Sequence, residues 1–157
     1  MMSRGTERVG RGSQWVLAQA VLLSAVIGSG FFADRHWDSA AGRVGGVALL
    51  ALAGLSMASG ALSLGRNLTP FPRPGREARL VQTGVYAWVR HPLYAALMVG
   101  AVGWALFREN LWTLGAAAAL VLFLHAKARR EEAWLKEHFP DYAAYARRVP
   151  RFLPFLY

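Results

Sequence analysis

Four stretches of this sequence are rich in apolar residues and almost free of charge, and polar segments separate them. The first two, residues 15–33 and 44–65, are about 20 residues long, enough for a helix to cross a ~30 Å hydrocarbon layer. The last two, 92–107 and 111–126, are shorter, and flanking aromatic residues can extend them into the interface. The pattern predicts an all-α integral membrane protein, a single membrane domain over residues 1–157 with four transmembrane helices.

The polar segments carry patterns of their own. Residues 66–90 contain three prolines, which forbid a continuous helix, but "LVQTGVYAWV" is too apolar and aromatic for a disordered segment. We expect this segment to fold over one mouth of the bundle. After the fourth stretch, "HAKARREEAWLKEHF" predicts a continuation of the helix. "DYAAYARRV" then predicts a short amphipathic cytoplasmic helix, and "PRFLPFLY" an apolar tail at the membrane interface.

The net charge of +9 is distributed as membrane topology requires. With both termini in the cytoplasm, 15 of the 18 basic residues fall in cytoplasmic segments, as the positive-inside rule demands. This explains the basic composition without nucleic-acid binding. Abundant Arg, Ala and Gly favour a bacterial plasma membrane, and the first apolar stretch is too long for a typical signal peptide. The absence of cysteine and the scattered histidines argue against a metal site.

Two adjacent glutamates follow the fourth stretch, and the helical period separates them. At about 100° per residue, Glu131 lies on the apolar stripe, where a charge is costly unless it is paired. Glu132 is rotated away, and we expect it to be solvated and to pair with Lys136. The candidate partners of Glu131 are Lys127, Arg90 and His91. These residues form either a structural ion pair between helices or part of a ligand site.

The stretch "RHPLY" at residues 90–94 predicts the start of a helix. Pro92 suits the first turn, and it favours an extended conformation for His91. The backbone N–H groups of Leu93 and Tyr94 then lack partners within the helix and lie beside Arg90. This combination suits a carboxylate or phosphate group.

"GVYAWVRHPLY", a hydrophobic hairpin and then "EEAWLKEHFPDYAAYARRVPRFLPF" together resemble the isoprenylcysteine carboxyl methyltransferase family and the related phospholipid N-methyltransferases. The resemblance covers about residues 66–157, where it implies a cofactor-binding region. It implies an integral membrane enzyme that transfers a methyl group from S-adenosylmethionine. The residues that it assigns to the cofactor are Leu80, Val81, Tyr86, His91, Pro92, Leu93, Tyr94 and Glu131.

By the same resemblance, Arg90, Lys127 and Glu131 are the expected catalytic residues. Lys127 stands where the family has an arginine that faces the methyl acceptor. Lysine keeps the charge but loses the two-pronged grip of arginine on a carboxylate. An ionised carboxylate acceptor requires no base, whereas an amine acceptor must lose its proton, to His91 or to Glu131.

The acceptor itself is left open by the sequence. We expect a lipophilic molecule that enters from the bilayer, such as a prenylcysteine carboxylate, another lipid, an isoprenoid acid or a small thiol. Three alternative functions remain beside this one. They are a non-catalytic membrane accessory module, a phospholipid N-methyltransferase, and a membrane reductase that binds NADPH.

Overall fold

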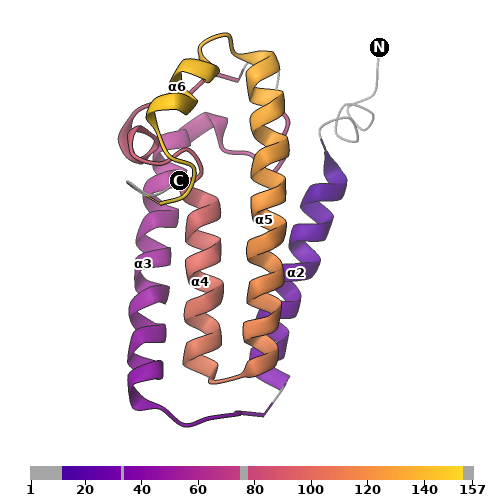
Figure 1. The fold of residues 1–157 in the computed structure, drawn as a ribbon, viewed down its shortest axis with the longest axis vertical. Coiled ribbons are helices and arrows are strands. Elements are labelled where there is room, and N and C mark those ends of the chain that lie inside the picture. Colours follow the sequence, from indigo (N-terminus) through magenta and orange to yellow (C-terminus); the bar gives the residue numbers. More distant parts are fainter. Residues whose placement is uncertain (1–11, 33, 75–77, 154–157) are drawn as a thin grey trace.

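The computed structural model describes residues 12–32, 34–74 and 78–153, which form helices and loops without a strand (Figure 1). The long helices are α2 (Ser13–Phe32), α3 (Ala40–Leu64), α4 (Pro92–Arg108) and α5 (Leu111–His138), and shorter elements are η1 (Gly65–Asn67), η2 (Gly84–Ala87) and α6 (Tyr142–Arg148). The predicted all-α fold is confirmed. The basic residues Arg4, Arg8, Arg11 and Arg76 and the end of the apolar tail lie outside the described residues.

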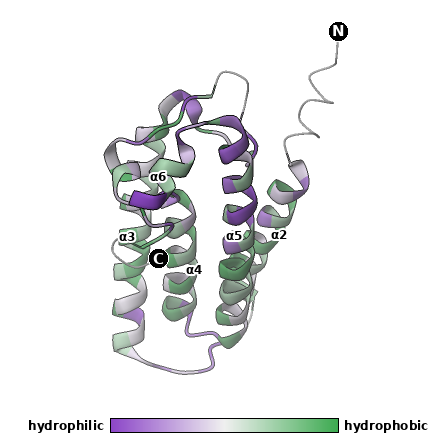
Figure 2. Cartoon of the chain, turned by 45° about the horizontal axis from the view of Figure 1, so that its top comes forward, coloured by the Kyte–Doolittle hydropathy of each residue, from purple (hydrophilic) through white to green (hydrophobic). Residues whose placement is uncertain are grey.

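Within the described residues, each predicted apolar stretch is helical. Three helices, α2, α3 and α5, are long and apolar enough to cross a membrane, and α4 is a shorter apolar helix. As predicted, α5 continues past residue 126 into a hydrophilic end (Figure 2). The segment between α3 and α4 and the helix α6 both lie at that same end of the bundle (Figure 1). The polar parts of the chain therefore gather beside the start of α4.

The packing of α3 against α4, the most extensive between two helices, depends on small residues. A methyl group added to Gly46 would lie 2.6 Å from the backbone nitrogen of Phe107, and one added to Gly60 would lie 2.7 Å from Leu93. The glycines thus permit a close approach of the two helices, as small residues do at helix contacts in membranes. A buried apolar cluster joins α2, α4 and α5; its members are Val26, Ala101, Ala117, Leu120 and Leu124.

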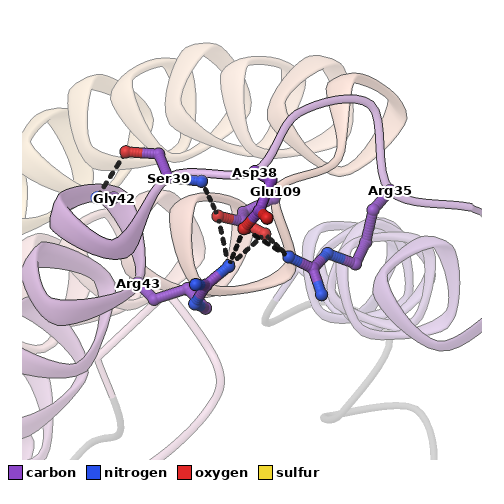
Figure 3. A network of polar contacts seen from close by, with 6 residues as sticks. All are labelled: Arg35, Asp38, Ser39, Gly42, Arg43 and Glu109. Carbon is purple, nitrogen blue, oxygen red and sulfur yellow. Dashed lines mark hydrogen bonds and ion pairs between the residues drawn. The ribbon is translucent and has the colours of Figure 1, made fainter.

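Glu109 fastens the turn between α4 and α5 to the loop between α2 and α3 (Figure 3). Its fully buried carboxylate accepts hydrogen bonds from the Ser39 N–H at 2.6 Å and from Arg43 at 3.0 Å, and it pairs with Arg35. Burial opposes ionisation, but the Ser39 N–H and the two guanidinium groups outweigh it and hold the pKa of Glu109 below its ordinary value. Glu109 is therefore a charged link between three segments.

Glu132 joins three segments at the opposite end of the bundle. Its carboxylate accepts two hydrogen bonds from the Arg151 guanidinium, both of 2.9 Å, and lies 3.2 Å from His91 Nε2 and 3.3 Å from Arg90 Nη2. The backbone N–H of Arg90 also donates to the carbonyl of Pro150 at 2.9 Å. The C-terminal segment is thus fixed to the start of α4 and to α5.

The position of Glu132 corrects the sequence analysis, which placed this residue in solvent beside Lys136. Glu132 is only 4% exposed, whereas Lys136 lies on the exposed face of α5. The physical reason is that this end of α5 is covered on two sides, by the start of α4 and by the segment after α6. The protein-facing surface of α5 is therefore wide enough to include both Glu131 and Glu132.

Acidification tests the role of Glu109. A carboxylate with a lowered pKa stabilises the folded state above its unfolded value of about 4.5, and this contribution is lost as the pH falls through the folded value. We expect the purified protein to melt at a lower temperature at pH values below about 4.5 than at neutral pH. Glu109→Gln should lower the melting temperature at neutral pH and flatten its dependence on pH. Asp34→Asn removes an exposed carboxylate from the loop between α2 and α3 and is the control. Equal pH profiles for Glu109→Gln and the wild type would contradict this role.

Substitution of Glu132 tests the C-terminal attachment. Glu132→Gln leaves two buried guanidinium groups without their carboxylate, which costs about 3 kcal/mol. This corresponds to a rise of roughly a hundredfold in the detached population of the segment after residue 141. Limited proteolysis in detergent micelles should show correspondingly faster cleavage there. Glu137→Gln, on the exposed face of the same helix, should not change the rate; equal rates for both variants would refute the attachment.

Candidate functional site

A cavity of about 820 Å³ opens at the polar end of the bundle, where α4 begins. Its wall is formed by the end of α3, the segment before α4, the first turn of α4, and parts of α5 and α6. It brings together most of the residues proposed from the sequence, namely Leu80, Val81, Tyr86, Arg90, His91, Leu93, Tyr94 and Glu131. Pro92 and Lys127 do not line it. Pro92 is buried where α4 meets α3.

Tyr86 is placed in the cavity wall by η2. Gly84 precedes it with φ of +61°, a conformation that glycine adopts without strain. The Tyr145 hydroxyl of α6 donates a hydrogen bond of 2.6 Å to the Tyr86 carbonyl. Burial raises the pKa of Tyr145 to about 12, so this hydroxyl keeps its proton at neutral pH. Tyr145 of "DYAAYARRV" therefore holds the loop that carries Tyr86.

The first turn of α4 presents backbone donors beside the cavity. Pro92 begins the helix, and the first backbone bond within it runs from the Ala95 N–H to the His91 carbonyl at 3.0 Å. The N–H groups of Leu93 and Tyr94 come before Ala95 in the helix, so they have no acceptor within it. Both residues line the cavity. The positive end of the helix is thus available to an anion, as the sequence predicts.

Glu131 lines the cavity and accepts a hydrogen bond of 2.5 Å from the Tyr94 hydroxyl. The Tyr94 ring is stacked on His91, with ring centroids 5.3 Å apart. The expected ion-pair partners of Glu131 are engaged elsewhere, since Arg90 and His91 contact Glu132. Among the described residues Glu131 makes no ion pair, and its carboxylate is shared between the Tyr94 hydroxyl of α4 and the cavity.

Arg90 serves the fold and faces the cavity at the same time. It contacts Glu132 and donates to the Ala146 carbonyl at 3.3 Å. Its Nε atom is buried, and no partner for it lies in the described part of the chain. An anion in the cavity is one way to satisfy this donor.

Lys127 lies one helical turn from Glu131, and its ammonium is 5.1 Å from the centroid of the Tyr94 ring. The side chain is 2% exposed, and its ammonium donates to Gln19 of α2 at 2.5 Å. Sequence reasoning missed Gln19 and Arg151. The signal for Gln19 was present, because it is an amide inside the apolar run "VLAQAVLL". Arg151 gave no comparable signal, since it is one of many basic residues near the C-terminus.

No group of three His, Asp or Glu side chains that could hold a metal ion occurs in residues 12–32, 34–74 and 78–153. The cavity combines one carboxylate that makes no ion pair with a described residue, helix N–H donors beside an arginine, and aromatic faces. Such a set suits an organic ligand that carries both an anionic and a cationic group.

Comparison with known proteins gives relatives of two kinds. The chain is 36% identical to nickel-cobalt-cadmium resistance protein NccN of Alcaligenes xylosoxydans xylosoxydans, over 89% of this chain and 62% of that protein. It is 34% identical to cobalt-zinc-cadmium resistance protein CzcN of Cupriavidus metallidurans, over 85% and 61%. It is 31% identical to protein-S-isoprenylcysteine O-methyltransferase B of Arabidopsis thaliana, over 71% and 58%. The chain thus spans about three fifths of the length of these relatives.

A solved structure shares the fold. The eukaryotic intramembrane Ras methyltransferase ICMT (isoprenylcysteine carboxyl methyltransferase) matches with a TM-score of 0.67 and 23% identity, over 91% of this chain and 53% of that one. This fold and the apolar helices identify an integral membrane protein. The family model for phospholipid methyltransferase matches residues 41–142. The predicted resemblance to isoprenylcysteine carboxyl methyltransferases is confirmed, and the chain belongs to the phospholipid methyltransferase family.

Proposed function

We propose that this protein is an S-adenosylmethionine-dependent methyltransferase that acts on a lipophilic acceptor. The observation that carries the proposal is the cavity at the start of α4, where Glu131 is unpaired by any described cation and helix donors stand beside Arg90. The family, whose members include methyltransferases, supports the reaction class.

The residues of the cavity fit the charges of this cofactor. The N–H groups of Leu93 and Tyr94, with Arg90, would hold its carboxylate. Glu131 would hold its ammonium group, and the faces of Tyr86 and Tyr94 would favour its sulfonium. Leu80 and Val81 would contact it mainly through backbone groups, while His91 and Pro92 support the wall.

When bound, the cofactor supplies a methyl group already activated for displacement. The protein's part is then alignment and exclusion of water rather than acid–base chemistry. A carboxylate acceptor would meet the positive charge of Lys127. An amine acceptor would require a base, for which Glu131 and His91 are the available groups.

We also propose a location for the site. The end of α5 that bears Lys127, Arg129 and Arg130 is strongly basic. The positive-inside rule therefore favours a cytoplasmic position for this end, for both termini, and for the cofactor entrance of a protein in a bacterial plasma membrane. The acceptor would reach the site from the bilayer.

Titration of S-adenosylmethionine into the purified full chain tests the cofactor. We expect saturable binding, and Glu131→Gln should weaken it at least tenfold, about 1.4 kcal/mol, because a charge-assisted contact is lost. Glu137→Gln, on the exposed face of α5, should bind as the wild type does.

Three outcomes would contradict the proposal. An absence of saturable binding in a detergent that preserves the fold would exclude the cofactor. Saturable binding without transfer of labelled methyl to any component of a lipid extract would favour the accessory module. Displacement of the cofactor by NADPH at similar concentration would favour the reductase.

A further inference from the structure

Two arginines stand together on the rim of the cavity. Arg66 and Arg79 both line it, and both are exposed. Arg66 is next to Asn67 in the chain, and the Arg79 N–H donates a hydrogen bond of 3.1 Å to the Asn67 side chain. Neither arginine makes an ion pair within residues 12–32, 34–74 and 78–153, whereas Arg90 contacts Glu132. The rim therefore carries two positive charges that no described carboxylate neutralises.

The rim lies where α3 ends at the membrane surface. Arg66 belongs to η1, which directly follows α3, one of the helices long and apolar enough to cross a membrane. Leu62 and Leu68, on either side of it in the chain, are 83% and 51% exposed. Exposed leucines at this level face lipid, and an arginine at the end of a spanning helix reaches the layer of head groups. The anions of that layer are the phosphates of phospholipids.

The chemistry of the rim favours an anionic phospholipid over a zwitterionic one. A guanidinium group binds phosphate oxygens through two parallel N–H bonds. Phosphatidylglycerol brings a phosphate without a cation, whereas the choline group of phosphatidylcholine would be repelled by the same arginines. Phosphatidylglycerol has no carboxylate, amine or thiol, so in this position it is a ligand and not a methyl acceptor.

A phosphate on the rim would change the electrostatics of the cavity. S-adenosylmethionine carries one carboxylate, one ammonium and one sulfonium, so its net charge is positive. Two guanidinium groups without a counter-ion on the rim oppose the entry of such a ligand. A phosphate bound between them would remove much of this repulsion.

We propose that Arg66 and Arg79 form a binding site for the phosphate of an anionic phospholipid, and that its occupation strengthens binding of the cofactor in the cavity. The second part rests on the proposed function. Cofactor binding then depends on the lipid composition of the membrane around the protein.

Titration of S-adenosylmethionine into the full chain tests this dependence in nanodiscs of phosphatidylcholine and in nanodiscs of equal parts phosphatidylcholine and phosphatidylglycerol. The surface potential of the anionic bilayer alone concentrates a monovalent cation roughly threefold. Neutralisation of the rim should raise the gain in affinity of the wild type to about tenfold. The double variant Arg66→Gln, Arg79→Gln should show only the threefold gain. It should also bind the cofactor more tightly than the wild type in phosphatidylcholine, because the repulsion is absent.

The matched control is the double variant Arg147→Gln, Arg148→Gln, which removes two exposed charges of α6 and should keep the full gain. Equal gains for all three proteins would overturn the proposal. Weaker cofactor binding by Arg66→Gln, Arg79→Gln in both lipids would indicate a structural role and would also overturn it. Soluble glycerol phosphate, added to phosphatidylcholine nanodiscs, distinguishes the sources of the anion. A gain equal to that with phosphatidylglycerol would overturn the assignment to a lipid.

Retention of the lipid without cofactor separates this site from the proposed function. Purified from mixed micelles of a neutral detergent and phosphatidylglycerol, the wild type should retain at least about threefold more of the lipid than Arg66→Gln, Arg79→Gln. The α6 control should retain as much as the wild type. Equal retention by all three would overturn the lipid site even where S-adenosylmethionine binds. Retention by the wild type without any binding of S-adenosylmethionine would exclude the proposed function, and with it the effect on the cofactor, but not the lipid site.

Discussion

The buried charge cluster around Glu132 is the interaction on which the site depends. One carboxylate contacts Arg90 and His91 at the start of α4 and Arg151 near the C-terminus. A buried carboxylate is stable only when several donors surround it, and here those donors come from segments far apart in sequence. The same contacts keep Arg90 and His91 in the cavity wall. The contacts that surround the Glu132 carboxylate therefore also hold part of the cavity wall in place.

The turn between α4 and α5 uses the same device. Glu109 is buried between Arg35 and Arg43, just as Glu132 is buried between Arg90 and Arg151. The helix pair α4–α5 is thus held near both of its ends by a carboxylate and two guanidinium groups, while the apolar middle packs without polar contacts of this kind. Such a frame suits a transfer reaction, which requires its two reactants to be held in a fixed alignment.

Much of the fold followed from hydropathy alone, because a membrane-spanning helix must be apolar over its whole length. The helical period also placed Glu131 facing inward. It failed for Glu132, because periodicity describes one helix and cannot show that α5 is covered on two sides. The same limit hid Gln19, whose partner lies 108 residues away in the sequence. Local patterns predicted the start of α4. Only the tertiary structure showed that Arg90 and His91 contact Glu132 and that Glu131 makes no ion pair with a described residue.

Two glutamates that are adjacent in sequence thus have separate tasks. Glu132 fixes residues of the cavity wall, and Glu131 presents its carboxylate to a ligand in the cavity. Because Arg90 and His91 contact Glu132, they line the cavity without forming an ion pair with Glu131. We propose that the cavity formed in this way binds the cofactor.

Hydrogen exchange of the full chain in nanodiscs, with and without S-adenosylmethionine, shows whether the cofactor binds in this cavity. We expect slower exchange on cofactor binding in residues 80–94 and 128–145, and unchanged exchange in the loop 34–39 at the opposite end of the bundle. Slower exchange confined to that distant loop, or no change in either cavity segment at a saturating cofactor concentration, would contradict this proposal.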